Sequence, residues 1–439
     1  MIALRYTRSP PFRTSMFLAA GLVASLPGCV SLPAAKPVGG MVSAPERSLD
    51  GVPAPVSTTI PLTMDGNRLY AEVSFRKADG GIRQAMAWVN FGMGGLSLSP
   101  SLRRDLGPEG SVAFFLGGIP VIVQPGAILP VDADDFKQLG PFPVEAILPA
   151  ALWPHYRVTL DYATRTLTLA QPSTAPVPGV AVPIEVNEGT GFATVLATVA
   201  GQSHPVVLDP GGGYTWWRGS VVRDWLTEHP NWYRADGAVG QSNQAMVDEA
   251  FEQQGTVVRV PSVRLGSLEL HDVGILGSAR GSLVDQVKYT LFWRLWGAGA
   301  PRPVDGWLGG NALKPYRITI DYQHRVSYWQ LAGVPDTGDL TSVGVSLVHG
   351  PQGYTIGGLV SRHGQAVLRD IQVGDTLLGV DGRDVRPMTR GAVITALGGQ
   401  AGEHRRLTLE RQGSIIEADT VVEAEAAISF PEEKPVRVP

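Results

Sequence analysis

Two short turns in this chain carry residues that could do chemistry. The segment 209–211 is Asp-Pro-Gly and follows the apolar run 206–208, and the segment 90–92 is Asn-Phe-Gly and follows the similar run 87–89. A carboxylate such as Asp209 can take up and release a proton, whereas the amide of Asn90 cannot do so at ordinary pH. The plain structural alternative is that Asp209 only caps backbone N–H groups of its own glycine-rich turn.

Other patterns typical of cofactor or metal sites are weak. The glycine runs 92–94 and 211–213 are not followed by the Lys-Ser/Thr pair, or by the glycine spacing, that opens a phosphate-binding helix. The eight histidines are scattered, and the single cysteine, Cys29, excludes a thiolate zinc cluster. The sequence has no Gly-x-Ser-x-Gly elbow of a serine hydrolase. It therefore predicts no metal and no cofactor.

The elements that must position the two turns occur twice. Tyr-Arg-Val-Thr-Leu-Asp-Tyr at 156–162 returns as Tyr-Arg-Ile-Thr-Ile-Asp-Tyr at 316–322, and Pro-Val-Glu-Ala-Ile-Leu at 143–148 returns as Pro-Val-Asp-Gly-Trp-Leu at 303–308. Self-similarity of this kind indicates a duplicated unit. Each copy predicts alternating strands, an apolar strand entering the turn, a variable middle, and a strand that ends in Asp-Tyr. The longer middle of the second copy predicts an enlarged flap or a surface insertion.

The order of these motifs resembles the retropepsin and pepsin-like aspartic peptidases, with two lobes in one chain. The resemblance covers about Ser57 to Ala332, and it is closer in the second copy than in the first. It implies two small β-barrel lobes whose turns meet at a pseudo-two-fold axis, beneath a cleft for an extended peptide. It also implies a catalytic pair of two carboxylates that share one proton, because like charges about 3 Å apart cannot both ionise.

The chain departs from that family at the residues that matter most. Asp209 occupies one dyad position and Asn90 the other, so the pair is incomplete and Asp209 is expected to remain ionised. Phe91 and Pro210 stand where the family has a hydroxyl that ties the turns together, and neither side chain donates a hydrogen bond. Gly92 and Gly211 remain, as a tight turn requires. Pro149 replaces a further glycine that the resemblance places in the first copy.

These departures favour a catalytically degenerate protein that binds extended peptides or envelope proteins. The first alternative is an active endopeptidase with an asymmetric site, in which Asp209 is the base and a group outside the motif replaces the lost acid. The second is an envelope scaffold with no enzymatic role. Trp216 and Trp217 follow the Asp209 turn, and we expect core packing for them, with a place at a cleft rim as the alternative.

A different pattern begins near residue 340. The run 365–382 contains Gly374-Asp375-Thr-Leu-Leu-Gly-Val-Asp-Gly and resembles PDZ domains, which bind an extended segment by adding it as a strand. The resemblance implies a peptide-binding loop and strand over residues 354–360. Within it we expect contacts from Tyr354, Ile356, Gly357, Gly358, Leu359 and Val360. The alternative is a unit that only packs on the lobes as a scaffold.

The N-terminus predicts export and a lipid anchor. Three arginines and no acid precede the apolar run 16–26, which is shorter than the about 18 residues that span a bilayer. The following Leu-Pro-Gly-Cys29 resembles the lipobox of bacterial lipoproteins, in which the cysteine is acylated and becomes the mature N-terminus. Val30 in place of Asp favours the outer membrane over the inner one by that family's sorting habit. An ordinary cleaved signal with an incidental cysteine is the alternative.

Composition agrees with a folded, strand-rich chain. Of 439 residues, 53 are Gly and 35 are Pro, which favours many turns and short strands over long helices. A net charge of −4 gives no basic field for nucleic acid. We therefore expect a mainly β protein with pepsin/retropepsin-like β-barrel lobes in tandem, followed by a PDZ domain. The expected segments are a signal peptide (1–29), a flexible tether (30–55), lobe 1 (56–172), lobe 2 (173–335), a PDZ domain (340–425) and a disordered tail (426–439).

Overall fold

The computed structural model describes residues 42–43, 55–107, 110–129, 136, 139–244, 250–279, 283–362, 365–366, 368 and 370–423. The fold is mainly β, as the composition predicts. The signal peptide with Cys29, nearly all of the tether, and the tail lie outside the described residues. No helix among the described residues is both long and apolar enough to cross a bilayer.

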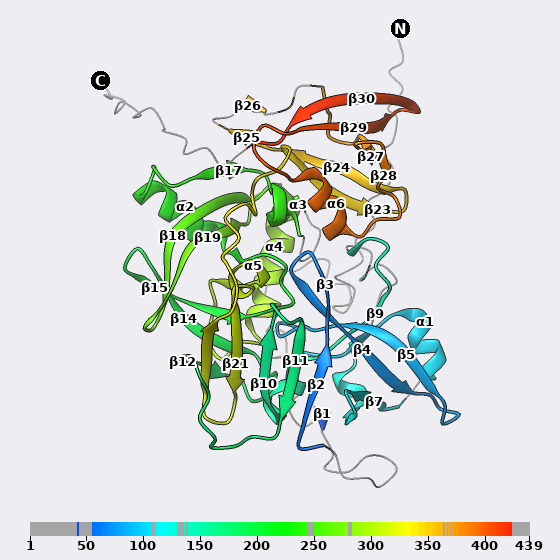
Figure 1. Cartoon of the computed structure of the whole chain (residues 1–439), viewed down its shortest axis with the longest axis vertical. Helices are drawn as coiled ribbons and strands as arrows, with labels where there is room; N and C mark the ends of the chain where they lie inside the picture. The colour runs from blue at the N-terminus through cyan, green and yellow to red at the C-terminus, as the bar shows by residue number, and fades with distance from the viewer. Residues whose placement is uncertain are drawn as a thin grey trace, which may run out of the picture.

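The chain forms two repeat units and a C-terminal unit, and Figure 1 shows the C-terminal unit, in orange and red, above the other two. The first repeat unit (residues 57–170, with β1 at 42–43 added to its edge) holds a sheet in the order β1-β8-β7-β4-β5-β9-β6, with β3 paired to β4. Its elements are β1 (Val42–Ser43), β2 (Ser57–Pro61), β3 (Thr63–Asp65), β4 (Arg68–Arg76), β5 (Ile82–Trp88), β6 (Ser97–Leu98), α1 (Pro100–Leu106), β7 (Val112–Leu116), β8 (Ile119–Val123), η2 (Pro125–Ala127), β9 (Val144–Ile147), η4 (Ala150–His155), β10 (Arg157–Asp161) and β11 (Thr166–Ala170).

The second repeat unit (residues 180–331) holds a sheet in the order β13-β14-β15-β20-β16-β19-β18-β17-β25-β26, whose last two strands come from the C-terminal unit. Its elements are β12 (Val180–Pro183), β13 (Glu185–Val186), β14 (Ala193–Val199), β15 (Gln202–Leu208), β16 (Trp216–Trp217), α2 (Gly219–Glu228), β17 (Arg234–Asp236), η5 (Gly240–Asn243), α3 (Ala250–Gln253), β18 (Thr256–Leu265), β19 (Leu268–Gly277), α4 (Leu283–Gly297), β20 (Gly306–Leu308), α5 (Gly310–Leu313), β21 (Tyr316–Asp321) and β22 (Val326–Leu331).

The two repeat units share a central sheet in the order β12-β22-β21-β10-β11-β2. Its middle strands, β10 and β21, are the two copies of the duplicated Tyr-to-Asp segment, and they pair antiparallel with each other. The register is symmetric about Thr159 and Thr319, whose hydroxyl oxygens lie 2.8 Å apart. Arg157 pairs with Asp321 on one side of this point, and Asp161 faces Arg317 on the other. This symmetry defines a pseudo-two-fold axis between the units.

The same pairings recur around each turn. β5, which leads to Asn90, runs parallel to β9, and β15, which leads to Asp209, runs parallel to β20. In both units a short strand then adds antiparallel to the other side of β9 or β20 and a helix follows it. The duplication seen in the sequence is therefore a duplication of topology.

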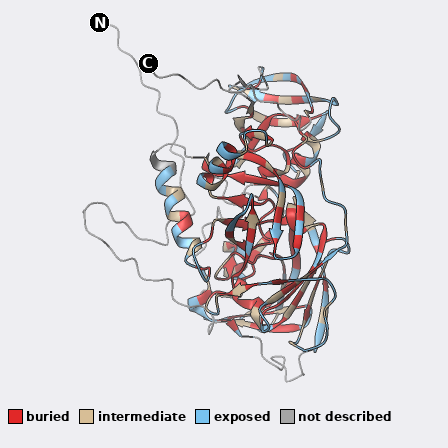
Figure 2. Ribbon diagram, turned by 90° about the vertical axis from the view of Figure 1, so that its left-hand side faces the viewer, coloured by how far each residue is buried: buried red, intermediate tan, exposed pale blue. Residues whose placement is uncertain are grey.

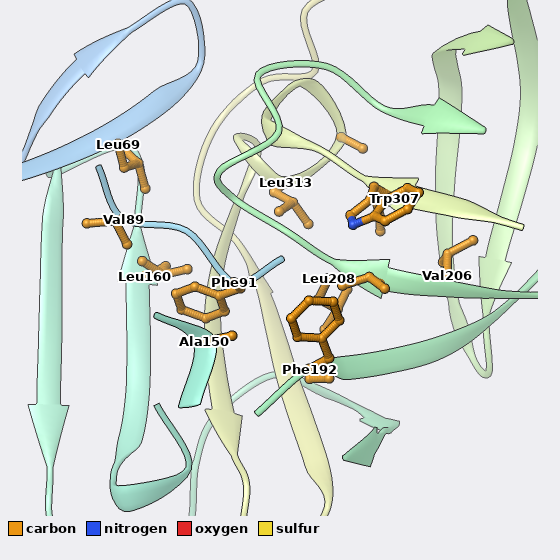
Figure 3. Packing of buried hydrophobic residues seen from close by; sticks show 14 of the residues in the cluster. Leu69, Val89, Phe91, Ala150, Leu160, Phe192, Val206, Leu208, Trp307 and Leu313 are labelled. Atoms are coloured by element: carbon orange, nitrogen blue, oxygen red, sulfur yellow. The ribbon is translucent and has the colours of Figure 1, made fainter. Parts of the chain in front are cut away.

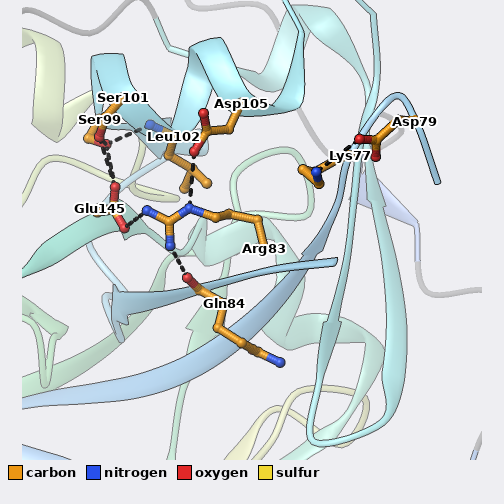
Figure 4. A network of polar contacts seen from close by, with 9 residues as sticks. All are labelled: Lys77, Asp79, Arg83, Gln84, Ser99, Ser101, Leu102, Asp105 and Glu145. Carbon is orange, nitrogen blue, oxygen red and sulfur yellow. Dashed lines mark hydrogen bonds and ion pairs between the residues drawn. The ribbon is translucent and has the colours of Figure 1, made fainter. Parts of the chain in front are cut away.

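In the first unit, a polar network fixes helix α1 against β9 (Figure 4). The hydroxyl of Ser99 accepts from the N–H of Leu102 at the start of the helix, at 3.1 Å. Glu145 of β9 accepts from the hydroxyl of Ser101 at 2.8 Å and from the guanidinium of Arg83 at 2.7 Å. Since these carboxylate and hydroxyl groups are used within the network, they serve to position the elements around the first turn.

The longer middle of the second unit is two insertions and not one. The first, between α2 and β18, carries β17, η5 and α3, and the second, between β19 and β20, carries α4. Helix α4 stands on the outside of the body with much of its surface exposed (Figure 2). The first insertion contacts the C-terminal unit, because β17 pairs with β25 and η5 lies against α6.

The C-terminal unit (residues 342–423) has its main sheet in the order β23-β24-β27-β29-β30, with β28 paired to β27. Its elements are β23 (Val345–Gly350), β24 (Gly353–Leu359), β25 (Ser361–Arg362), β26 (Gln365–Ala366), β27 (Thr376–Val380), β28 (Arg383–Asp384), α6 (Arg390–Leu397), β29 (His404–Arg411) and β30 (Ser414–Val421). Its core is a cluster of its own, whereas one continuous apolar cluster runs through both repeat units.

Candidate functional site

The symmetric pairings bring the two turns together at the axis. A Cβ atom on Gly211 would lie 2.4 Å from the amide nitrogen of Asn90 and 2.9 Å from Oδ1 of Asp209. A Cβ atom on Gly92 would likewise lie 2.6 Å from Oδ2 of Asp209. Any side chain at either position would collide with the facing turn, so both glycines are required for this close approach.

Each turn is closed by the same hydrogen bond. Oδ1 of Asn90 accepts from the N–H of Gly92 at 2.7 Å, and Oδ1 of Asp209 accepts from the N–H of Gly211 at 2.8 Å. Asp209 does one thing more, because the same oxygen also accepts from the N–H of Phe91 in the other unit, at 3.0 Å. Its carboxylate therefore caps its own turn and also links the two turns across the axis.

The residues that replace the expected hydroxyls serve packing. Phe91 is fully buried and its ring stacks on Trp153 at a centroid distance of 4.8 Å. The indole N–H of Trp153 donates to the backbone oxygen of Asn90 at 2.9 Å. Figure 3 shows Phe91 and Leu208, which immediately precedes Asp209, in one apolar cluster. Pro149 precedes η4 in extended conformation, and Pro210 follows Asp209 without an N–H to donate.

Burial governs the charge of Asp209. The side chain is only 1% exposed, and this desolvation raises its pKa from 3.8 to about 6. The N–H groups of Phe91 and Gly211 and the positive charge of Arg68 act in the opposite direction and limit the rise. Asp209 is therefore mostly ionised at pH 7, but it gains a proton in mildly acidic solution.

No carboxylate among the described residues forms a hydrogen bond with Asp209 or Asn90. The other repeated acids have structural partners: Asp161 accepts from the N–H of Thr164 at 3.0 Å, and Asp321 pairs with Arg157 at 2.8 Å. Among the described residues, Asp209 is thus the carboxylate that joins the two turns at the axis.

Two tyrosines belong to this site although the sequence analysis did not single them out. Tyr162 and Tyr322 end the duplicated strands and are buried, and burial raises the pKa of each, with the charge of Asp209 adding to the rise. Within the described part of the chain, neither hydroxyl has a hydrogen-bond partner, and the same holds for the indole nitrogen of Trp307. That nitrogen lies 3.1 Å from the point that a Gly92 Cβ would occupy. The repeated Asp-Tyr ending was the signal that could have identified the tyrosines.

A hairpin of the first unit supplies Arg68, the cation whose charge lowers the pKa of Asp209. Arg68 of β4 is 1% exposed, and its guanidinium lies 5.2 Å from the ring centroid of Trp88. It donates a hydrogen bond to the backbone oxygen of Gln244 in the second unit. Asn67 beside it donates to the side-chain oxygen of Gln241 at 2.6 Å. The β3–β4 hairpin therefore connects the surroundings of Asp209 to the first insertion of the second unit.

The aromatic residues after the Asp209 turn belong to the core. Trp216 and Trp217 are 2% and 0% exposed, and Trp216 packs against Phe292 and Trp293 of helix α4. They form no cleft rim, and the expectation of core packing is confirmed. Trp216 therefore anchors the second insertion, whereas Trp217 packs against His204 and Trp225.

The prediction of a peptide-binding strand at 354–360 is contradicted at the start of that segment. β23 pairs with β24 on one side, and on the other side β27 and the loop before it take the backbone groups of Tyr354, Thr355 and Ile356. An added strand needs an unpaired edge. Tyr354, Ile356 and Val360 are fully buried, and the N–H of Val360 donates to the backbone oxygen of Gly344. Gly358 and Leu359 pair with β23, and Gly357 lies at the register shift between the two strands. The edge strand on this side is β23.

No family model matches this chain, and no curated protein is significantly similar to it. Its function is therefore inferred from the geometry of the site.

Proposed function

We propose that this chain is a lipid-anchored, peptide-binding protein of the cell envelope, built on a bilobal aspartic-peptidase-like unit that has lost its hydrolytic pair and on a PDZ-like C-terminal unit. The two-fold arrangement of the repeat units supports the first assignment, since turns at the ends of matched strands meet at one axis. The sheet with helix α6 beside it supports the second.

The observation that carries the proposal is the amide of Asn90 opposite the carboxylate of Asp209. Hydrolysis by an aspartic dyad needs one acid to activate water and a second to polarise the peptide carbonyl. An amide performs neither proton transfer, and Asp209 has no second carboxylate bonded to it among the described residues. In addition, Asp209 and Asn90 are 1% and 6% exposed, so a substrate reaches neither in this conformation.

An active endopeptidase with an asymmetric site is the second candidate, and one observation favours it. The pKa of Asp209, about 6, suits a general base that works near neutral pH. This candidate requires that the turns become accessible and that another group supply the missing acid. An envelope scaffold is the third candidate, and no specific contact among the described residues favours it.

One experiment separates the candidates. The purified protein is incubated with a reduced, carboxymethylated protein from pH 3 to pH 7, with Asp209→Asn as the matched variant. We expect no cleavage by either protein, together with saturable binding of the unfolded chain. Cleavage by the wild type that is lost in the variant would establish the second candidate. If neither cleavage nor binding is observed, the envelope scaffold is the remaining candidate.

The envelope location is a proposal with its own test. It rests on the arginine-rich start, the apolar run 16–26 and the single cysteine, Cys29. We expect palmitate labelling of the wild type in a bacterial host and recovery in the membrane fraction. Cys29→Ser is expected to abolish the label. An unlabelled wild type would refute the lipid anchor without bearing on the hydrolytic site.

A further inference from the structure

The edge of the C-terminal sheet that is open to strand addition, β23, is already in contact with another part of this chain. The bridging segment (residues 238–244) comes from the first insertion of the second unit and includes η5. The backbone N–H of Leu347 in β23 donates to the side-chain oxygen of Asn243 at 2.8 Å. The hydroxyl of Ser346 donates to the backbone oxygen of Ala238 at 2.6 Å.

Helix α6 completes the enclosure of the bridging segment. Arg390, the first residue of α6, is fully buried and donates to the backbone oxygen of Leu347 at 2.6 Å. The same guanidinium donates to the backbone oxygen of Asn243 at 2.9 Å. The N–H and C=O of Leu347 thus have the hydrogen bonds that an added peptide strand would provide. Asn243 supplies one of them and Arg390 the other.

The fit of this internal occupant is incomplete. Within the described part of the chain, the buried side-chain nitrogen of Asn243 and the buried side-chain oxygen of Gln244 have no hydrogen-bond partner. Buried polar groups that lose their partners destabilise the state that contains them. An extended peptide whose backbone pairs along β23 would return both side chains to solvent, and this favours exchange.

The bridging segment is also connected to the surroundings of Asp209. The guanidinium of Arg68, whose charge lowers the pKa of Asp209, donates to the backbone oxygen of Gln244. The carboxylate of Asp65 in the β3–β4 hairpin accepts from the hydroxyl of Thr389 at 2.5 Å and from the N–H of Gly391 at 3.2 Å, at the start of α6. One hairpin therefore touches the bridging segment and α6 together.

We propose that β23 and α6 form the peptide-binding groove of the C-terminal unit, and that the bridging segment is its built-in occupant, displaced by an extended polypeptide that adds to β23. This inference rests on the proposed peptide-binding function and names its site and its regulation. Displacement separates Gln244 from Arg68, so occupation of the groove by a partner loosens the cover beside Asp209. Recognition is through the backbone of the partner, chiefly at Leu347.

Two variants change the occupant in opposite directions. Asn243→Ala removes the acceptor for the Leu347 N–H and keeps the backbone oxygen that Arg390 uses. The double variant Asp236→Cys with Ser361→Cys ties β17 to β25, because these two residues face each other as Cα partners within reach of a disulfide. Both are made in the full chain carrying Cys29→Ser. Gln330→Ala, an exposed amide on β22, is the matched control.

The probe is a phage-displayed library of random seven-residue segments with free C-termini. We expect at least tenfold greater enrichment on Asn243→Ala than on the wild type or on Gln330→Ala, and none on the oxidised cysteine pair until it is reduced. Equal enrichment on all proteins would overturn the built-in occupant but would leave peptide binding intact. No enrichment on any protein would refute peptide binding at this edge. The cleavage assay described above tests the Asp209 site separately, whatever the outcome of the enrichment experiment.

Hydrogen exchange gives a second measurement. In Asn243→Ala, we expect faster exchange of the Leu347 amide and, through Arg68 and Gln244, of the β3–β4 hairpin. Unchanged exchange of Leu347 would show that Asn243 does not hold this edge.

Discussion

Replacing Asp209 with asparagine should make the protein more stable at neutral pH, although it removes the residue at the centre of the site. The amide keeps an oxygen for the N–H groups of Gly211 and Phe91, which Oδ1 accepts at 2.8 and 3.0 Å. It removes the need to bury a negative charge in a site that is 1% exposed. The variant thus isolates the electrostatic contribution of the carboxylate.

The size and pH dependence of the effect follow from the pKa. Well below pH 3.8 the carboxyl is protonated in both the folded and the unfolded chain, so it contributes no difference. Between 3.8 and about 6 the folded chain keeps the proton that the unfolded chain has lost, and stability falls as pH rises. Since a tenfold change in proton affinity is worth about 1.4 kcal/mol, the full destabilisation above pH 6 is about 3 kcal/mol.

The assay is guanidinium unfolding followed by tryptophan fluorescence from pH 4 to pH 8. We expect the difference in free energy of unfolding, variant minus wild type, to increase by about 2–3 kcal/mol between pH 4 and pH 7. Asp224→Asn, on the exposed face of helix α2, controls for the loss of a carboxylate as such. A difference for Asp209→Asn that stays constant or decreases with pH would refute a buried acid whose pKa is raised.

Two further substitutions test the contacts between units. Gly391→Ala would gain about 1 kcal/mol as a helix substitution, but its Cβ would lie 2.4 Å from the N–H nitrogen of Gly66; we expect a net loss of about 1–3 kcal/mol. Thermal unfolding measures the change in stability, with Gly297→Ala as the control. The new Cβ at 297 would meet open space, so this control should not destabilise the protein. Arg157→Met removes the guanidinium partner of buried Asp321, 2.8 Å away between the repeat units, and leaves His324 at 2.9 Å; it should lower the free energy of unfolding by about 3 kcal/mol. A loss under about 1 kcal/mol in denaturant unfolding would contradict a buried ion pair.

Repetition explains how much of the site the sequence could predict. Two copies of one strand pattern pair most simply with each other, and β10 does so with β21 about Thr159 and Thr319. Once these strands are paired, the turns at Asn90 and Asp209 must approach the same axis. This is a consequence of local patterns and symmetry, both of which can be read from the chain.

Contacts between different units could not be predicted from the sequence in this way. The strand at 354–360 has the local pattern of a peptide-binding strand, but its neighbours in the sheet decide where it is an edge, and β27 occupies that side at Tyr354 and Thr355. Similarly, nothing in the spacing of Asn243, Arg390 and Leu347 predicts that three distant segments meet. Such contacts depend on how complete surfaces dock, which short sequence patterns do not encode.

The asymmetry of the two turns bears on why an acid stands at 209. Asn90 shows that an amide closes this kind of turn, with a 2.7 Å bond to the N–H of Gly92. The carboxylate of Asp209 forms the equivalent bond and one more across the axis, and an amide oxygen could accept both. A buried charge with a raised pKa therefore adds nothing that the turns require. Groups that destabilise the fold while titrating near neutral pH are typical of functional sites. If Asp209→Asn proves more stable, packing does not account for the acid, and its function must be sought in the state in which the bridging segment and the hairpin have moved away.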